Sequence, residues 1–316
     1  MIDLVKIAST TDKYNFHSHT QFCDGRATME EFVREAIALG YSHYGFSPHC
    51  PVKIESSCNM SQDRVEEYLN EVTRLQQAYG NKINLYASME IDFFDDFGPS
   101  HPYFQDLALD YRIGSVHFIP SFDDNSKYID IDGRFSNFEK KMSEFFHDDI
   151  EEVVKSYFRQ SMKMIEQGGF DIIAHCDKIG LNASYYRNGI TEENWYQLLL
   201  KRHFEAILDH RYRIEINTKA WEQQNRLFPH SKFFSMLKKH NVPVLCKLIN
   251  TGLQLFSPTE NHLIATAIAN AILASSLPAA AAAGFFFGAS CGRIESKRAM
   301  PFIDTLVITI KTDKKM

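Results

Sequence analysis

The segment "YNFHSHTQFCDG", residues 14–25, places His17 and His19 two residues apart at the end of a short apolar run, and Asp24 follows five positions later. In an extended strand, residues i and i+2 point to the same side, so both imidazoles would share one face. Paired imidazoles suit a metal ion, whereas an apolar core would leave their ring nitrogens without partners. A surface strand with two solvated histidines explains this pair equally well, so the rest of the chain must decide.

Short strand-like stretches and helical patterns alternate along most of the chain. After the strand that ends in His17 and His19, further strands are predicted at 41–49, 83–93, 111–119, 170–175, 212–218 and 242–246. Helices are predicted within 27–40, 61–80, 148–169, 192–210 and 232–240, with N-caps at Thr28 and Ser61. Repeated β-α units predict a parallel sheet with right-handed crossovers, and seven of them can close into a TIM-like barrel. We therefore predict an α/β fold without a domain boundary before residue 246.

Histidines and one glutamate fall at the ends of successive predicted strands. In a parallel barrel, all C-terminal strand ends meet on one face, where active sites are built. A lone histidine near a strand end is usually a core or surface residue, but a series of them predicts a metal centre. The candidate ligands are His17, His19, Asp24, His49, Glu90, His117 and His175.

The types of these side chains narrow the choice of metal. Imidazoles with carboxylates suit Zn, Mn or Fe better than Ca or Mg. The set is too large for one tetrahedral ion, and a carboxylate such as Glu90 can bridge two ions, so a site with more than one metal ion is predicted. Paired metals activate water and stabilise the oxygens of a phosphoryl or acyl transfer. Cys23, Cys50 and Cys176 each adjoin a candidate ligand; because neighbours in a strand point to opposite sides, we interpret them as packing residues.

Composition limits the classes of function. Of the 316 residues, 44% are hydrophobic and 23% charged, which is typical of a globular protein with a sizeable core. A net charge of −6 argues against a nucleic-acid partner. The six cysteines have no C-x-x-C spacing, which fits a reduced, cytoplasmic setting. Residues 261–292 carry no charge and are long enough to span a bilayer, but Pro278 and the dominance of alanine favour a buried or misfolded tail over an anchor.

One stretch interrupts the regular alternation of strands and helices. Residues 120–147 are polar and aromatic and directly follow the fourth predicted strand. An insertion at that place would lie over the mouth of the barrel, so we predict a lid or substrate loop. A surface excursion without a role is the alternative.

Six motifs now point to a family. "FHSHTQFCDG", "FSPH", "SMEID", "GSVHFI", "AHCDKIG" and "EINT" resemble, in order, the motifs of the PHP (polymerase and histidinol phosphatase) superfamily, in its histidinol-phosphatase branch. The resemblance covers roughly residues 12–245. It implies a distorted (β/α)7 barrel over residues 1–246, with two or three divalent metal ions (Zn, Mn or Fe) at the C-terminal strand ends. It also implies the hydrolysis of L-histidinol phosphate to L-histidinol and phosphate, a step of histidine biosynthesis.

The same resemblance assigns roles to the candidate ligands. His17 and His19 would bind one metal, and Asp24 and His49 another. Glu90 would bridge to an ion held by His117 and His175; these three are the predicted catalytic residues, because a metal-bound hydroxide would attack phosphorus there. The substrate phosphate would meet a cation, and the candidates are Lys219 after "EINT", Lys178 after "AHCD" and, more weakly, Arg187. A solvated surface role is the alternative for each cation.

The C-terminal part departs from the family pattern. A Ser-Asp-x-His motif should follow the seventh strand, and no such motif occurs in this chain. Residues 247–316 instead form an atypical, apolar, Ala-rich tail. The resemblance then implies that two of three metals each lack one ligand. The alternatives to a histidinol phosphatase are therefore another PHP-type phosphoesterase with a different small phosphorylated substrate, a PHP nuclease, or a catalytically impaired relative tethered to a membrane through 261–292.

Overall fold

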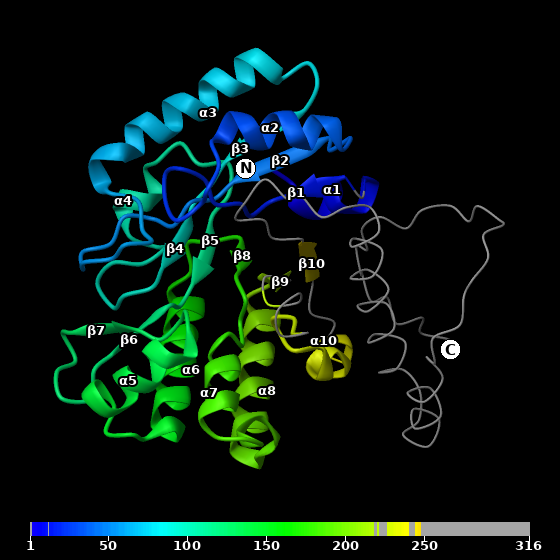
Figure 1. The fold of residues 1–316 in the computed structure, drawn as a ribbon. Helices are drawn as coiled ribbons and strands as arrows, with labels where there is room; N and C mark the ends of the chain where they lie inside the picture. Colours follow the sequence, from blue (N-terminus) through cyan, green and yellow to red (C-terminus); the bar gives the residue numbers. More distant parts are fainter. Residues whose placement is uncertain (1, 12, 218–219, 221–225, 240–243, 248–316) are drawn as a thin grey trace, which may run out of the picture.

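Two parallel sheets carry the strand ends at which the candidate ligands lie (Figure 1). The computed structural model describes residues 2–11, 13–217, 220, 226–239 and 244–247. The first sheet has the order β1-β2-β3, made of Tyr14–Asn15, His43–Phe46 and Asn84–Ala87. The second has the order β10-β9-β8-β5-β4, made of Val244–Lys247, Arg213–Asn217, Ile172–Ile173, Ile113–Ser115 and Glu90–Asp92.

The third predicted strand, residues 83–93, contributes β3 to the first sheet and β4 to the second. Only Ser88 and Met89 separate β3 from β4, and a parallel bridge pairs His49 with Glu90 across this junction. All pairings within both sheets are parallel, as predicted, and each of the seven predicted strand stretches contains at least one strand. No pairing among the described residues joins β10 to β1. The structure therefore has an α/β fold with parallel sheets, and closure into a barrel stays a prediction.

Helices α2 (Met29–Ala38) and α3 (Val65–Tyr79) lie side by side over the first sheet (Figure 1). Thr28 caps α2 with the predicted capping box: its side chain accepts from the backbone of Glu31, and the Glu31 side chain accepts in return. Ahead of α3, Ser61 occupies the predicted N-cap position, at the start of the short 3-10 helix η1 (Gln62–Arg64), but its side chain forms no capping hydrogen bond. Helix α1 (Leu4–Thr10) precedes β1, and α4 (Pro102–Gln105) follows β4.

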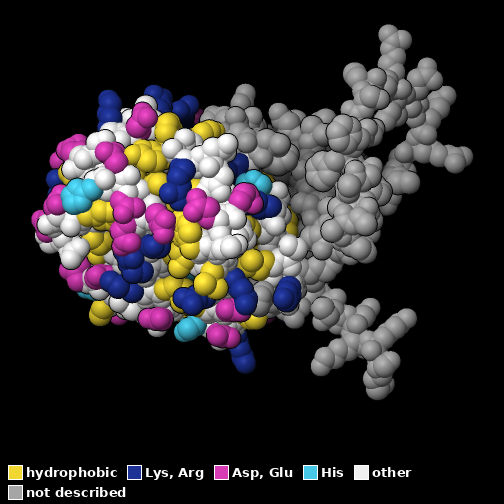
Figure 2. All heavy atoms as spheres, turned by 90° about the horizontal axis from the view of Figure 1, so that it is seen from below, with side chains coloured by type: hydrophobic (Ala, Val, Ile, Leu, Met, Phe, Trp, Pro, Cys, Tyr) yellow, Lys and Arg dark blue, Asp and Glu magenta, His cyan; other side chains and the backbone are white. Residues whose placement is uncertain are grey.

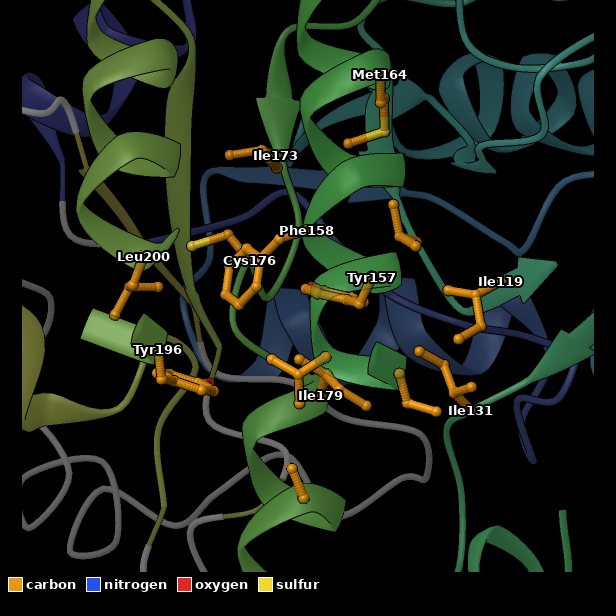
Figure 3. Packing of buried hydrophobic residues seen from close by; sticks show 14 of the residues in the cluster. Ile119, Ile131, Tyr157, Phe158, Met164, Ile173, Cys176, Ile179, Tyr196 and Leu200 are labelled. Atoms are coloured by element: carbon orange, nitrogen blue, oxygen red, sulfur yellow. The ribbon is translucent and has the colours of Figure 1, made fainter. Parts of the chain in front are cut away.

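The largest apolar cluster lies between the second sheet and the helices α6 (Ile150–Gln167), α7 (Ile179–Tyr186) and α8 (Asn194–Asp209). Figure 3 shows Tyr157 and Phe158 of α6 in this cluster, with Ile173 of β8 and Leu200 of α8 around them. Each such side chain contributes about 1.5–3 kcal/mol when fully buried. Cys176 lies in the same cluster and Cys50 in the one beneath α2 and α3, as expected of packing residues. The remaining short helices are η2 (Ile190–Glu192), η3 (Ser231–Phe233) and α10 (Phe234–Lys239).

The insertion at 120–147 is a folded unit. Strands β6 (Phe118–Pro120) and β7 (Tyr128–Asp130) form an antiparallel hairpin, and helix α5 (Phe135–Phe145) follows. Phe138 and Met142 of α5 are fully buried in the apolar cluster of α6. The insertion is thus anchored to the body of the protein by its own apolar side chains.

Among the described residues, no helix combines the length and the apolar character needed to cross a bilayer. The predicted tail and the uncharged stretch 261–292 lie outside the described residues. On the face in Figure 2, acidic and basic side chains are interspersed, without a continuous basic surface of the kind that nucleic acid requires.

Candidate metal centre

Glu90, the first residue of β4, lies at the centre of a cluster of five histidines. Its carboxylate is buried, with 1% of the side chain exposed. Oε2 lies 3.0 Å from Nε2 of His17, 3.1 Å from Nε2 of His19 and 3.3 Å from Nδ1 of His49. Oε1 lies 2.7 Å from Nε2 of His175 and 3.7 Å from Nε2 of His117. We call Glu90 and these five residues the histidine cluster.

The strand ends hold the members of the cluster in place. Ser18, between the first two histidines, donates its backbone N–H to Oγ of Ser47 at 3.0 Å and its hydroxyl to the Gly45 carbonyl at 2.9 Å, which ties this segment to β2. His175, after β8, has a φ of 25°. A non-glycine residue in this region of the backbone is uncommon, and such conformations gather at functional sites.

Three carboxylates bind the far sides of the imidazoles. Nδ1 of His117 lies 2.7 Å from Asp92, Nδ1 of His19 lies 2.7 Å from Asp24, and Nδ1 of His17 lies 2.9 Å from Glu215. A carboxylate that accepts the Nδ1 proton fixes the tautomer whose Nε2 lone pair faces Glu90. The sequence analysis missed Asp92 and Glu215. Asp92 stands two residues after Glu90, so the same-side rule that paired His17 with His19 could have found it.

The potential ligand atoms form four overlapping triads, each with all atoms within 4.8 Å of one another. The triads are His17–His19–Glu90, His19–Asp24–His49, His49–Asp92–His117 and Glu90–His117–His175. Nε2 of His17 lies 3.1 Å from Nε2 of His19. Two nitrogen ligands at about 2.0–2.1 Å from a tetrahedral zinc ion stand roughly 3.3 Å apart. The donor set and its spacing therefore fit divalent metal ions.

Burial keeps part of the cluster in the form that binds metal. It lowers the pKa of His49 to about 3, and burial together with the charge of Lys178 lowers that of His175 to about 3. Both imidazoles are therefore neutral near pH 7 and able to coordinate. For Glu90, burial favours the neutral acid, but electrostatic interactions with the surrounding rings of His17, His49 and His117 and the hydrogen bond with His17 outweigh burial and hold the pKa well below its usual range. A carboxylate thus persists in the centre of the buried cluster.

The three predicted phosphate-binding cations have different surroundings. Lys178 lies in the turn after His175, and its Nζ pairs with Oδ2 of Asp132 at 2.7 Å. Arg187 pairs with Glu193 at 2.8 Å, and none of its described contacts reaches the histidine cluster. Lys219 lies outside the described residues. Of the two cations that the structure describes, Lys178 lies nearer to the site.

A pocket of about 490 Å³ opens beside the cluster. Its lining includes His49 and His117, the segment 54–59 and residues of the insertion. Its acidic residues outnumber its basic ones: they are Asp24, Glu55, Asp92, Asp130 and Asp132, against Lys141.

Comparison with known proteins agrees with this arrangement. The sequence matches the PHP domain family over residues 15–219. This chain belongs to that family. The match contains every candidate ligand and both missed carboxylates, Asp92 and Glu215, so it covers the whole histidine cluster.

Relatives of this PHP chain carry one recurrent name. The "Histidinol-phosphatase" of Bacillus subtilis is 27% identical over 160 residues, covering 46% of this chain and 58% of the relative. The "Probable histidinol-phosphatase" of Schizosaccharomyces pombe is 26% identical over 235 residues, covering 66% of this chain and 70% of the relative. The similarity thus spans little more than half of the Bacillus protein.

A solved structure supports the fold. Histidinol phosphate phosphatase of Lactococcus lactis, solved with Zn, L-histidinol and phosphate, aligns with a TM-score of 0.61 and 19% identity, covering 82% of this chain and 94% of the other. At this identity the likeness establishes a shared fold and nothing about substrate.

Proposed function

We propose that this PHP protein is a metal-dependent phosphatase that hydrolyses L-histidinol phosphate to L-histidinol and phosphate. The observation that carries the proposal is the buried Glu90 carboxylate among five imidazoles. Without metal, such an array would bury several polar groups with incomplete hydrogen bonding. In this proposal His17, His19 and Glu90 would hold one ion and Glu90, His117 and His175 another, while Asp24 and His49 would contribute to a third position.

Different residues of the chain would have different roles in the reaction. When bound, divalent ions of the Zn, Mn or Fe type supply an activated water and offset the charge on the phosphate oxygens. Asp92, Asp24 and Glu215 orient the imidazoles through their Nδ1 protons. Lys178 offers ammonium donors to a phosphoryl oxygen, and Lys219 is a second candidate. The buried setting strengthens each of these charge interactions.

The pocket favours a substrate with a cationic end. A phosphomonoester bound at the histidine cluster would extend its organic part into the cavity lined by His49 and His117. Glu55 at the side of this pocket is exposed, and a carboxylate there suits a positively charged amine. L-Histidinol phosphate has such an amine, and two named relatives and one solved neighbour carry that substrate in their names.

The test is phosphate release by the purified protein loaded separately with Zn, Mn or Fe. We expect turnover of L-histidinol phosphate to exceed that of neutral phosphomonoesters such as glycerol phosphate, and to vanish after chelation. Equal turnover of both substrates would favour another small-molecule phosphatase. A protein that takes up no metal would refute the proposal.

The missing Ser-Asp-x-His motif favours a second candidate, a relative with impaired catalysis. A position that lacks a ligand binds its ion less tightly and less precisely. The ion at Glu90, His117 and His175 would then be held most tightly. Replacing the residues after Leu245 with a segment that contains Ser-Asp-x-His should raise both metal stoichiometry and turnover, whereas full turnover in the unaltered chain would exclude this candidate.

A further inference from the structure

Lys178 is a largely buried lysine, with 10% of its side chain exposed. It lies three residues after His175, and its backbone N–H donates to the His175 carbonyl at 2.9 Å. The turn between β8 and α7 therefore fixes the main chain of both residues together. An ammonium group at such a depth requires compensation by a charged partner.

Asp132 of the insertion supplies that charge, at 2.7 Å from Nζ. The neighbouring main chain is held from two sides: the N–H of Ile131 donates to the His117 carbonyl at 2.9 Å, and the side chain of Asn182 in α7 donates to the Ile131 carbonyl at 3.2 Å. Asp132 is thus attached both to the strand end that carries His117 and to the helix that follows Lys178. Its position is set by the same elements that build the histidine cluster.

The charge of Lys178 acts on the histidine cluster. Burial works to lower the pKa of Lys178, but Asp132, Glu90 and Glu215 together raise it above its ordinary value. A lysine in contact with solvent alone would not interact with these buried groups.

The ammonium group has unused capacity for hydrogen bonds. Lysine carries three donors. Among the described residues, the one recorded side-chain partner of Lys178 is Asp132. Two donors are thus left for an anion bound beside the histidine cluster, where a phosphate oxygen is the natural acceptor.

We propose that Asp132 is a positioning residue: its carboxylate aims the ammonium group of Lys178 at the phosphoryl oxygens and so links the insertion to phosphate binding. This inference rests on the proposed function for the identity of the anion. Asp132 does not contact the phosphate, because two anions would repel each other. It acts through Lys178.

The experiment measures the binding of inorganic phosphate to the zinc-loaded protein by calorimetry, so that it does not depend on turnover. Asp132→Asn keeps the shape of the side chain but removes the charge, and we expect at least tenfold weaker phosphate binding with unchanged zinc content. Asp132→Glu should restore part of the affinity. Asp123→Asn is the matched control: Asp123 lies on the same insertion and pairs with His147 at 2.9 Å, outside the pocket, and its loss should leave phosphate affinity unchanged.

A double variant separates positioning from a general effect on folding. If Asp132 acts through Lys178, Lys178→Met should weaken phosphate binding as much, and Asp132→Asn should add nothing in that background. Additive losses, or an affinity of Asp132→Asn equal to that of Asp123→Asn, would overturn the inference. Weak hydrolysis of histidinol phosphate combined with the expected binding losses would refute the proposed substrate and leave the positioning role intact.

Discussion

The Nδ1 nitrogen of His117 lies 2.7 Å from Oδ1 of Asp92, and both side chains are almost completely buried. Both groups stand at the ends of adjacent parallel strands, β4 and β5. The carboxylate fixes the ring so that Nε2 faces Glu90, which makes Asp92 the support of one potential metal ligand.

Asp92→Asn should weaken metal binding at the position of His117 and His175 by about 10–100-fold, because an amide accepts the Nδ1 proton less strongly and no longer raises the basicity of the ring. Zinc titration followed by calorimetry checks this. Asp96→Asn is the control, since Asp96 forms an exposed pair with Lys53, and it should bind zinc as the unaltered protein does. Equal affinity in both variants would remove Asp92 from the site.

Glu90→Gln should abolish most phosphatase activity and reduce the amount of metal bound per chain. A neutral amide has the same shape but cannot bridge two cations, and it leaves the surrounding imidazoles without their counter-charge. Elemental analysis and phosphate release from L-histidinol phosphate measure the two effects. Normal metal content together with normal turnover would rule out the bridging role.

His203→Phe should make the protein less sensitive to acid. His203 of α8 is fully buried against Phe158 and Phe204, and both ring nitrogens are without a hydrogen-bond partner among the described residues. Burial lowers its pKa from 6.5 to about 3. Below pH 6.5 the unfolded chain therefore binds a proton that the folded protein does not, and stability falls as the pH falls.

Because of His203, the free energy of unfolding should fall by about 1.4 kcal/mol for each pH unit below 6.5, or by roughly 2 kcal/mol at pH 5. Above pH 6.5 the ring is neutral in both states, and this contribution to stability is fully present. Urea unfolding of the unaltered protein and of His203→Phe is measured at pH 8 and at pH 5. At pH 8 the two free energies of unfolding differ only through the change in packing. The prediction fails if the two proteins lose the same free energy of unfolding between these pH values.

Gly45→Ala should destabilise the fold. A Cβ atom at this position in β2 would lie 1.9 Å from Oη of Tyr111, whose hydroxyl donates to the carbonyl of Phe16. Tyr111 is fully buried, so it cannot move aside without disturbing the segment that leads to His17. Overpacking of this kind typically costs about 1–3 kcal/mol.

Chemical denaturation of Gly45→Ala, alone and in a Tyr111→Phe background, tests whether the clash with the Tyr111 hydroxyl causes the destabilisation. Removing the hydroxyl removes the nearest atom, so the alanine should cost less in the second background. An identical cost in both would assign the effect to the strand backbone instead.

The sequence predicted the parallel α/β architecture because the seven apolar stretches and the helices between them carry local signals, such as the capping box at Thr28 and Glu31. It also predicted which strand ends would converge, and the cluster around Glu90 has the residues expected. Local patterns identified Asp24 and contain a signal for Asp92, but they could not identify Glu215, the carboxylate that supports His17. Glu215 is 198 residues from its partner His17, and only the folded chain brings the two together.

The insertion also contains contacts that local sequence patterns do not predict. Its polar composition predicted a loop over the site, but Phe138 and Met142 occur at helical spacing and bury α5 in the large apolar cluster, beside α7. The pairing of Asp132 with Lys178 joins the insertion to the turn after β8, and neither residue carries a sequence signal for the other. By contrast, the side-chain cap expected of Ser61 depended on loop geometry that a motif does not determine.

The overlap of the four triads sets a limit on how many ions they can hold at once. His19, His49 and His117 each belong to two triads, as does Glu90. A neutral imidazole has a single lone pair to donate, whereas a carboxylate has several. Among the described residues, two complete triads can therefore be filled together only if they share no histidine, and the pair that meets at Glu90 satisfies this. A third complete triad would have to take an imidazole from one of them, whereas a third ion held by Asp24 and His49 alone would have two of these ligands and would bind less tightly than the other two.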